Sequence, residues 1–239
     1  MKLAIITGGS RGLGKALVDL HAKHGWAVRE FSRSGTSEHH IPCDLSQFED
    51  SATIISNTFR QLSAQDWREV RLINNAGLLD PVGPLRFHAP EQWQTNIQVN
   101  IYSYIVATGL FMKNFNAIDT KYCLANISSG ASVKAYYGWS LYCASKAAIE
   151  AFTRSVALEQ SYRNNPVVAV IIVPGVIETA MQDLIRRQDS EHFKDVDRFI
   201  RLKRQGKLQS PEEVAEGVYA IMNGTLVGGE KYYVKDYLS

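Results

Sequence analysis

The sequence predicts an α/β fold, a doubly wound parallel sheet of about seven strands with helices on both faces. Short β-branched apolar runs alternate along the 239 residues with longer stretches whose apolar residues recur at helical spacing. Residues Val167–Val173 are apolar throughout, as a central strand covered by helices on both faces requires. Because no repeat and no Pro/Gly/Ser-rich linker divides the chain, we expect one domain over residues 1–239.

In the first half, a strand over Leu3–Ile6 ends at a glycine turn and a helix follows over Gly12–His24. The next predicted elements are a strand over Trp26–Ser32, a short strand over His39–Cys43, a helix over Gln47–Ser63 and a strand over Val70–Asn74. Only residues 33–38 separate the second strand from the third, whereas a parallel crossover usually takes about a dozen residues. We therefore expect a connection without a helix there.

The second half continues the alternation, and its last helix has the clearest start. In Ser210-Pro211-Glu212-Glu213, a capping serine precedes a proline and two acids at the positive end of the helix dipole. The elements predicted here are helices over Glu91–Phe115, Leu141–Tyr162 and Ser210–Met222, and strands over Tyr122–Ser128, Val167–Val173 and Lys231–Val234.

Composition excludes several classes of protein. With 26 Lys and Arg against 24 Asp and Glu, the net charge of +2 predicts neither a nucleic-acid nor a membrane partner. The longest apolar run has seven residues, too few to span a bilayer, and no signal peptide is visible. Three cysteines favour a reducing compartment, so we expect a cytoplasmic protein. Glu38 with His39 and His40 is too small a set for a metal, and we expect none.

The glycine-rich segment Thr7-Gly8-Gly9-Ser10-Arg11-Gly12-Leu13-Gly14 lies between the first strand and the first helix. Glycines let the backbone approach a pyrophosphate, and a helix N-terminus stabilises its negative charge. A tight turn without a ligand would also explain three glycines. Its position in the first strand–helix unit makes nucleotide binding the better interpretation.

The T-G-x-x-x-G-x-G spacing resembles the short-chain dehydrogenase/reductase family, whose fold is a Rossmann-type sheet. Further features follow in the family's order along most of the chain. They are Asn74-Asn75-Ala76-Gly77 after the fourth strand, Asn100 in the next helix, Ser129 located 13 residues before Tyr142-x-x-x-Lys146, and Pro174-Gly175 followed by Thr179.

The resemblance implies a nicotinamide dinucleotide, and the residues after the second strand favour NADP(H). Phe31-Ser32-Arg33-Ser34 lacks the acid that holds a ribose 2′-hydroxyl, while Arg33 can bind a 2′-phosphate bidentately. Arg11 points to the same pocket in NADP-preferring members of the family. The implied cofactor-binding residues are Gly8, Ser10, Arg11, Gly12, Leu13, Gly14, Ser32, Arg33, Asp44, Leu45, Asn75, Ala76, Gly77, Tyr142, Lys146, Pro174, Gly175, Val176, Ile177 and Thr179.

Four residues are the candidate catalytic set: Asn100, Ser129, Tyr142 and Lys146. Lys146 lies one helical turn after Tyr142, where its ammonium favours the phenolate of a tyrosine whose pKa is ordinarily near 10. By resemblance, Tyr142 is the general acid for carbonyl reduction, and Ser129 hydrogen-bonds the carbonyl oxygen. Lys146 would also hold the nicotinamide ribose, and Asn100 would organise a water that links Lys146 to solvent.

Residues around Tyr142 are similar to the sepiapterin reductase and bacterial benzil reductase branch of the family, which reduces adjacent carbonyls with NADPH. Gly138-Trp139 before the tyrosine carries this similarity, as does the acid, threonine and Met-Gln pattern after Pro174-Gly175. The expected substrate residues are Ser129, Tyr137, Trp139, Tyr142 and Met181. Packing at a helix end explains Trp139 equally well. Residues 179–209 would form a lid over the substrate.

The sequence thus favours an NADPH-dependent reductase of a dicarbonyl or aryl ketone. A pterin substrate is disfavoured because Tyr233 stands where sepiapterin reductases have an aspartate. The alternatives left open are a 3-ketoacyl or pterin reductase of the same family and a non-catalytic NADP-sensing protein. By resemblance, helices Glu91–Phe115 and Leu141–Tyr162 would form the interface of a homodimer, or of a tetramer.

Overall fold

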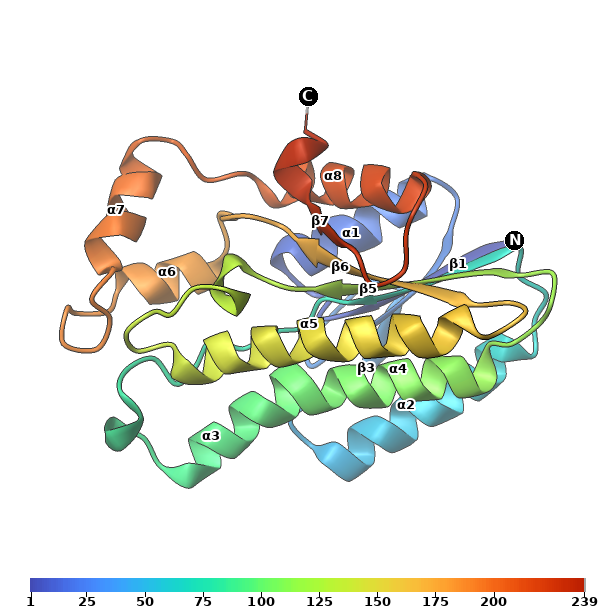
Figure 1. The fold of residues 1–239 in the computed structure, drawn as a ribbon, viewed down its shortest axis with the longest axis horizontal. Helices are drawn as coiled ribbons and strands as arrows, with labels where there is room; N and C mark the ends of the chain where they lie inside the picture. Colours follow the sequence, from blue (N-terminus) through green and yellow to red (C-terminus); the bar gives the residue numbers. More distant parts are fainter. Residues whose placement is uncertain (239) are drawn as a thin grey trace.

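The computed structural model describes residues 1–238, and its centre is a seven-stranded sheet in the order β3-β2-β1-β4-β5-β6-β7 (Figure 1). Every neighbouring pair of strands is parallel. The predicted fold class is confirmed. The strands are β1 (Lys2–Thr7), β2 (Ala27–Ser32), β3 (His40–Pro42), β4 (Glu69–Asn74), β5 (Lys121–Ile127), β6 (Val167–Val173) and β7 (Lys231–Tyr233).

Helices cover both faces of this sheet (Figure 1). Leu17 of α1 and Val218 of α8 are fully buried in one core, and Phe59 of α2 and Phe111 of α4 are buried in the core on the other face. The α-helices are α1 (Gly12–Lys23), α2 (Phe48–Ser63), α3 (Pro90–Ile97), α4 (Ser103–Asn114), α5 (Ser140–Ser161), α6 (Ala180–Arg186), α7 (Val196–Arg204) and α8 (Pro211–Asn223). None of the helices in residues 1–238 is both long and apolar enough to cross a bilayer.

The register of the central strands brings three loops to one edge of the sheet. Thr7 at the end of β1 pairs with Asn74 at the end of β4, and Asn74 pairs with Asn126 near the end of β5. The segments that follow these strands therefore meet at the carboxyl edge, where parallel α/β sheets bind their ligands.

Two local predictions are confirmed. Residues 33–39 form turns and bends without a helix between β2 and β3. At the start of α8, Ser210 Oγ accepts from the Glu213 amide (3.2 Å), and Glu213 Oε2 accepts from the Ser210 amide (2.8 Å). This reciprocal pair satisfies donors that a helix N-terminus leaves unpaired.

The predicted helix over Glu91–Phe115 is interrupted. A wider π-helical turn, η2 (Gln98–Tyr102), separates α3 from α4. Asn100 lies in this turn with its side chain fully buried. Apolar periodicity does not predict such a turn, because the contacts that Asn100 makes there with Leu78 lie outside the helix.

Candidate active site

The glycine turn between β1 and α1 leaves no room for larger residues. Gly8 adopts φ +69°, and a Cβ on Gly14 would lie 2.0 Å from the Gly8 carbonyl oxygen. α1 begins at Gly12. Within residues 1–238 no side chain caps this helix N-terminus, and its first turn contains no acidic residue. Its first amide groups are therefore available to an anion, so the turn fits a pyrophosphate.

Asn75 and Thr7 fasten this turn to the loop after β4. Asn75 Nδ2 donates to the carbonyl oxygens of Thr7 (3.0 Å) and Gly8 (3.2 Å). Thr7 Oγ1 accepts from the amides of Asn75 and Ala76. The predicted segments 8–14 and 75–77 thus form one rigid unit.

The predicted residues after β6 border the same turn. A Cβ on Gly12 would lie 3.2 Å from Thr179 Cγ2, and Gly175 adopts φ +89°. Ile177 forms an isolated parallel bridge with Gln209. Segment 174–179, which contains Pro174 and Val176, therefore passes beside the start of α1.

The last residues of β2 include a carboxylate, Glu30, that the sequence analysis did not single out. Glu30 is 1% exposed, and its Oε1 accepts from His40 Nδ1 (2.6 Å) and Ser32 Oγ (3.3 Å). Since strand residues two apart share a face, Glu30 and Ser32 point the same way, and this spacing is the signal that could have identified Glu30. The Ser32 hydroxyl is thus already used, whereas Arg11 and Arg33 are exposed and form no ion pair within residues 1–238.

Two further predicted cofactor residues lie on the segment between β3 and α2. Leu45 is buried, and Asp44 is half-buried. Asp44 Oδ1 accepts from both the amide and the hydroxyl of Ser46. These bonds fix the carboxylate at the start of α2 through an Asx turn.

Lys146 and Tyr142 share one face of α5, as predicted. Both side chains are buried, and Lys146 Nζ lies 5.7 Å from the centroid of the Tyr142 ring. Lys146 donates to the carbonyl oxygen of Ile127 at the end of β5 (2.8 Å) and to Tyr104 Oη (3.5 Å). Ser129 follows β5 and caps η3 (Gly130–Ser132), its Oγ accepting from the Ala131 amide.

Burial determines the titration of these side chains. Burial raises the pKa of Tyr142, although hydrogen bonding with the Ser129 side chain opposes this rise. Burial also lowers the pKa of Lys146 to about 8. The expected preference for a phenolate is therefore not met in the protein alone, because desolvation outweighs the hydrogen bond with Ser129 and keeps the pKa of Tyr142 above its ordinary value. Tyr142 is a protonated phenol at neutral pH.

The side chain of Asn100 is occupied by neighbouring protein groups. Its Oδ1 accepts from the Leu78 amide (2.8 Å), and its Nδ2 donates to the Leu78 carbonyl oxygen (2.7 Å) and to Asn96 Oδ1 (3.0 Å). A Cβ on Gly77 would lie 3.8 Å from Asn100 Oδ1 and 3.9 Å from Lys146 Nζ. The amide of Asn100 thus holds the loop after β4 close to Lys146.

Tyr104 is a second residue that the sequence reasoning missed. It is fully buried, donates to the Ala76 carbonyl oxygen (2.8 Å) and accepts from Lys146. It links the glycine-turn unit to the lysine. Its position four residues after Asn100 in a helical segment was the available signal.

Some of the expected substrate residues are buried in the structure and others are exposed. Trp139 is 6% exposed and stacks on Phe193 of the segment between α6 and α7, with centroids 4.5 Å apart. Met181 packs against the same cluster, whereas Tyr137 is exposed. Tyr136, the residue before it, contacts the Trp139 ring, with centroids 4.9 Å apart.

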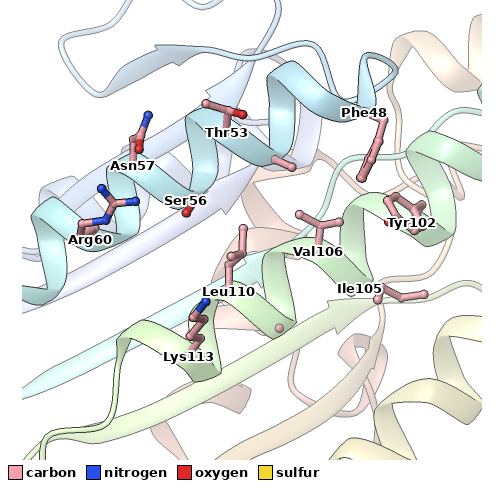
Figure 2. Close-up of a pocket in the computed structure, with 12 residues that line it drawn as sticks. Phe48, Thr53, Ser56, Asn57, Arg60, Tyr102, Ile105, Val106, Leu110 and Lys113 are labelled. Atoms are coloured by element: carbon pink, nitrogen blue, oxygen red, sulfur yellow. The ribbon is translucent and has the colours of Figure 1, made fainter.

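A groove of about 610 Å³ lies elsewhere, between α2 and α4 (Figure 2). Phe48 and Tyr102 meet edge to face at one end, and Arg60 and Lys113 line it further along. None of the predicted site residues lines it. Within residues 1–238, no three His, Cys, Asp or Glu side chains gather in a group that could hold a metal ion.

Comparison with known proteins gives a consistent result. The family model described as short chain dehydrogenase matches residues 2–190. The chain is 35% identical to a benzil reductase ((S)-benzoin forming) of Bacillus cereus, over 91% of this chain and 92% of that protein. It is 32% identical to the enzyme of the same name from Bacillus subtilis (strain 168), over the whole of both chains.

Solved structures agree on the fold. A short-chain dehydrogenase/reductase from Saccharomyces cerevisiae superposes with a TM-score of 0.86 over 100% of both chains at 21% identity. The KRED1-Pglu enzyme superposes with a TM-score of 0.84 at 27% identity, over 97% of this chain and 100% of that one. Together with the geometry around Tyr142 and Lys146, these similarities show that the chain belongs to the short-chain dehydrogenase/reductase family of oxidoreductases.

Proposed function

We propose that the chain is an NADPH-dependent carbonyl reductase that transfers hydride to a small dicarbonyl or aryl ketone, with Tyr142 as the general acid. One observation carries the proposal: a buried phenol and a buried ammonium lie together on α5, next to the Ser129 turn at the carboxyl edge of the sheet. The identity with two benzil reductases favours a substrate with adjacent carbonyls and aromatic rings.

The residues fit a dinucleotide. The uncapped start of α1 and the close approach of Gly8 and Gly14 leave backbone donors for a pyrophosphate. Arg11 and Arg33, both exposed, are suited to a 2′-phosphate, which is the basis for preferring NADP(H) over NAD(H). When bound, the coenzyme supplies the hydride that reaches the carbonyl carbon.

The side chains of this chain handle the proton. Tyr142 Oη gives its proton to the carbonyl oxygen as charge develops there, and the Ser129 hydroxyl donates a hydrogen bond to the same oxygen. The phenolate left behind is stabilised by the Lys146 ammonium, whose own position is fixed by the Ile127 carbonyl. Asn100 bonds to Leu78 and so holds the adjacent Gly77 beside this lysine.

The segment 179–209 is proposed as the substrate lid. Phe193 and Phe199 are buried against Trp139, and Tyr142 belongs to the same cluster. This packing would shield the substrate site from bulk water. Met181 and Ser129 are the remaining proposed substrate contacts, with Tyr137 at the exposed rim.

The test is a substrate panel. Purified protein with NADPH or NADH is mixed with benzil, other diketones, aryl ketones and pterins, and the decay of nicotinamide absorbance is followed. We expect turnover with NADPH and diketones, and much slower turnover with pterins. Coenzyme binding without turnover of any carbonyl would contradict the reductase proposal and favour the NADP-sensing alternative.

A further inference from the structure

A buried carboxylate lies one helical turn beyond Lys146 on α5. Glu150 is 3% exposed, and its Oε1 accepts from Ser128 Oγ (2.8 Å) and Ser132 Oγ (2.5 Å). Its Oε2 pairs with Lys231 Nζ (2.5 Å) on the edge strand β7. One carboxylate thus joins the end of β5, the turn that follows it, α5 and β7.

The two serines bonded by Glu150 lie on either side of Ser129. Ser128 precedes it, and Ser132 ends the short η3 turn that Ser129 caps. On the other side of this segment, Lys146 donates to the Ile127 carbonyl oxygen. Two consecutive turns of α5 are therefore fastened to the chain before and after Ser129.

Glu150 is held as an anion. Burial acts to raise its pKa, but hydrogen bonds from Lys231, Ser132 and Ser128 outweigh burial and keep the pKa below its usual value. Arg154 contributes a second, half-exposed cation 3.7 Å away. A carboxylate can accept all these bonds at once, whereas a neutral amide of the same size loses the charge and one acceptor.

The geometry of carbonyl reduction explains why this fastening matters. Ser129 and Tyr142 must both reach one substrate oxygen, yet they come from different elements, the η3 turn after β5 and the first turn of α5. Their separation is determined by how α5 docks on that turn. A displacement of about 1 Å in such a constellation can cost on the order of 100-fold in rate.

We propose that Glu150 is a positioning residue of the active site, which, with Lys231 as its counter-ion, holds the Ser128–Ser132 turn against α5 and fixes the Ser129 hydroxyl relative to the Tyr142 phenol. The proposal rests on the reductase function above. It assigns the role to a side chain that touches neither substrate nor coenzyme.

Glu150→Gln is the first variant. We expect kcat for diketone reduction to fall roughly 10- to 100-fold while the Kd for NADPH, measured by fluorescence, changes less than about twofold. Glu150→Asp, which keeps the charge, should recover part of the loss. Glu216→Gln, a change of an exposed acid on α8, is the matched control and should leave kcat unchanged.

Coupling to Ser129 separates positioning from general stability. If Glu150 acts through Ser129, Glu150→Gln added to Ser129→Ala should lower kcat little further. The same fold loss in both backgrounds would overturn the proposal. If Glu150→Gln fails to fold, Lys231→Met replaces it in this test, because it removes the counter-ion and keeps the carboxylate. Lys231→Met should lower kcat in the wild-type background and lower it little further in Ser129→Ala.

The outcomes for the two proposals differ. A wild-type protein that binds NADPH but reduces no carbonyl overturns the proposed function and this inference together. An active wild type with an equally active, folded Glu150→Gln overturns this inference alone.

Discussion

The indole of Trp139 meets the phenol ring of Tyr142 edge to face, with centroids 5.8 Å apart and an interplanar angle of 74°. The same indole stacks on the ring of Phe193, which is fully buried and nearly parallel to it. Trp139 therefore connects the proposed lid to the proposed acid. Trp139 is therefore a buried packing residue, and the proposal that it also lines the substrate site is compatible with this packing.

Phe193→Ala should loosen this connection. Removing a fully buried aromatic ring costs about 3–5 kcal/mol of unfolding free energy, measured by urea denaturation. Amide exchange in residues 180–204 should also accelerate. Ile118→Ala removes an 84% exposed side chain and should change stability by less than about 0.5 kcal/mol. Equal effects of the two substitutions would contradict the structural role of Phe193.

Tyr142→Phe should abolish carbonyl reduction and leave NADPH binding nearly intact. The substitution removes the hydroxyl that donates the proton but keeps the buried ring and its contact with Trp139. Turnover and fluorescence titration measure the two effects separately. Tyr162→Phe, at the exposed end of α5, is the control and should be fully active. Retained turnover in Tyr142→Phe would rule out the assigned acid.

Arg33→Ala should weaken NADPH binding about 10- to 100-fold and NADH binding far less. The estimate follows from the loss of a charge-assisted contact to a 2′-phosphate, worth about 1.5–3 kcal/mol. Isothermal titration with each coenzyme provides the comparison. Arg163→Ala, which removes another exposed arginine, should affect neither coenzyme. Similar losses for NADPH and NADH would contradict the NADP preference.

Stability should fall with acidification because of His21. Burial lowers the pKa of His21 from 6.5 to about 4, so between these pH values the unfolded chain binds a proton that the folded chain excludes. Its contribution is complete above pH 6.5 and is lost as pH falls toward 4, by up to about 3 kcal/mol. Denaturation at several pH values gives the free energy of unfolding as a function of pH. This free energy should fall less steeply with acidification in His21→Phe than in His24→Asn, a change of an exposed neighbour. The same pH dependence of the unfolding free energy in both variants would contradict the role of His21.

The proposed homodimer can be tested at an exposed leucine. Leu158 on α5 is 62% exposed, and Tyr102 and Ile105 near the start of α4 are also largely apolar and exposed. If these helices form the interface, Leu158→Glu should convert a two-chain species into a monomer in light scattering. Ile118→Glu, a change of another exposed apolar residue, should not. A monomeric wild type would refute the dimer.

Structural features that depend on residues close together in the sequence could be predicted from the sequence. The all-apolar run Val167–Val173 predicted the buried strand β6, and the Ser210 signature predicted the start of α8. The shortness of residues 33–38 predicted a connection without a helix. The family motifs predicted which loops would meet, because the ends of parallel strands gather at one edge.

The sequence by itself determined the sheet, the helices that alternate with its strands and the group of residues that carry the proposed chemistry, since strand and helix periodicity and the glycine turn depend on near neighbours. It did not predict the interruption by η2, and the helices α6 and α7 were not among the predicted elements. Only the tertiary structure revealed what surrounds those residues. Glu150 reads as an ordinary polar position, yet it is buried because Lys231, distant along the chain, pairs with its charge, and Glu30 is buried beside His40 of the neighbouring strand. Packing of distant segments, which no local pattern encodes, decided which charges are buried and therefore how the site titrates.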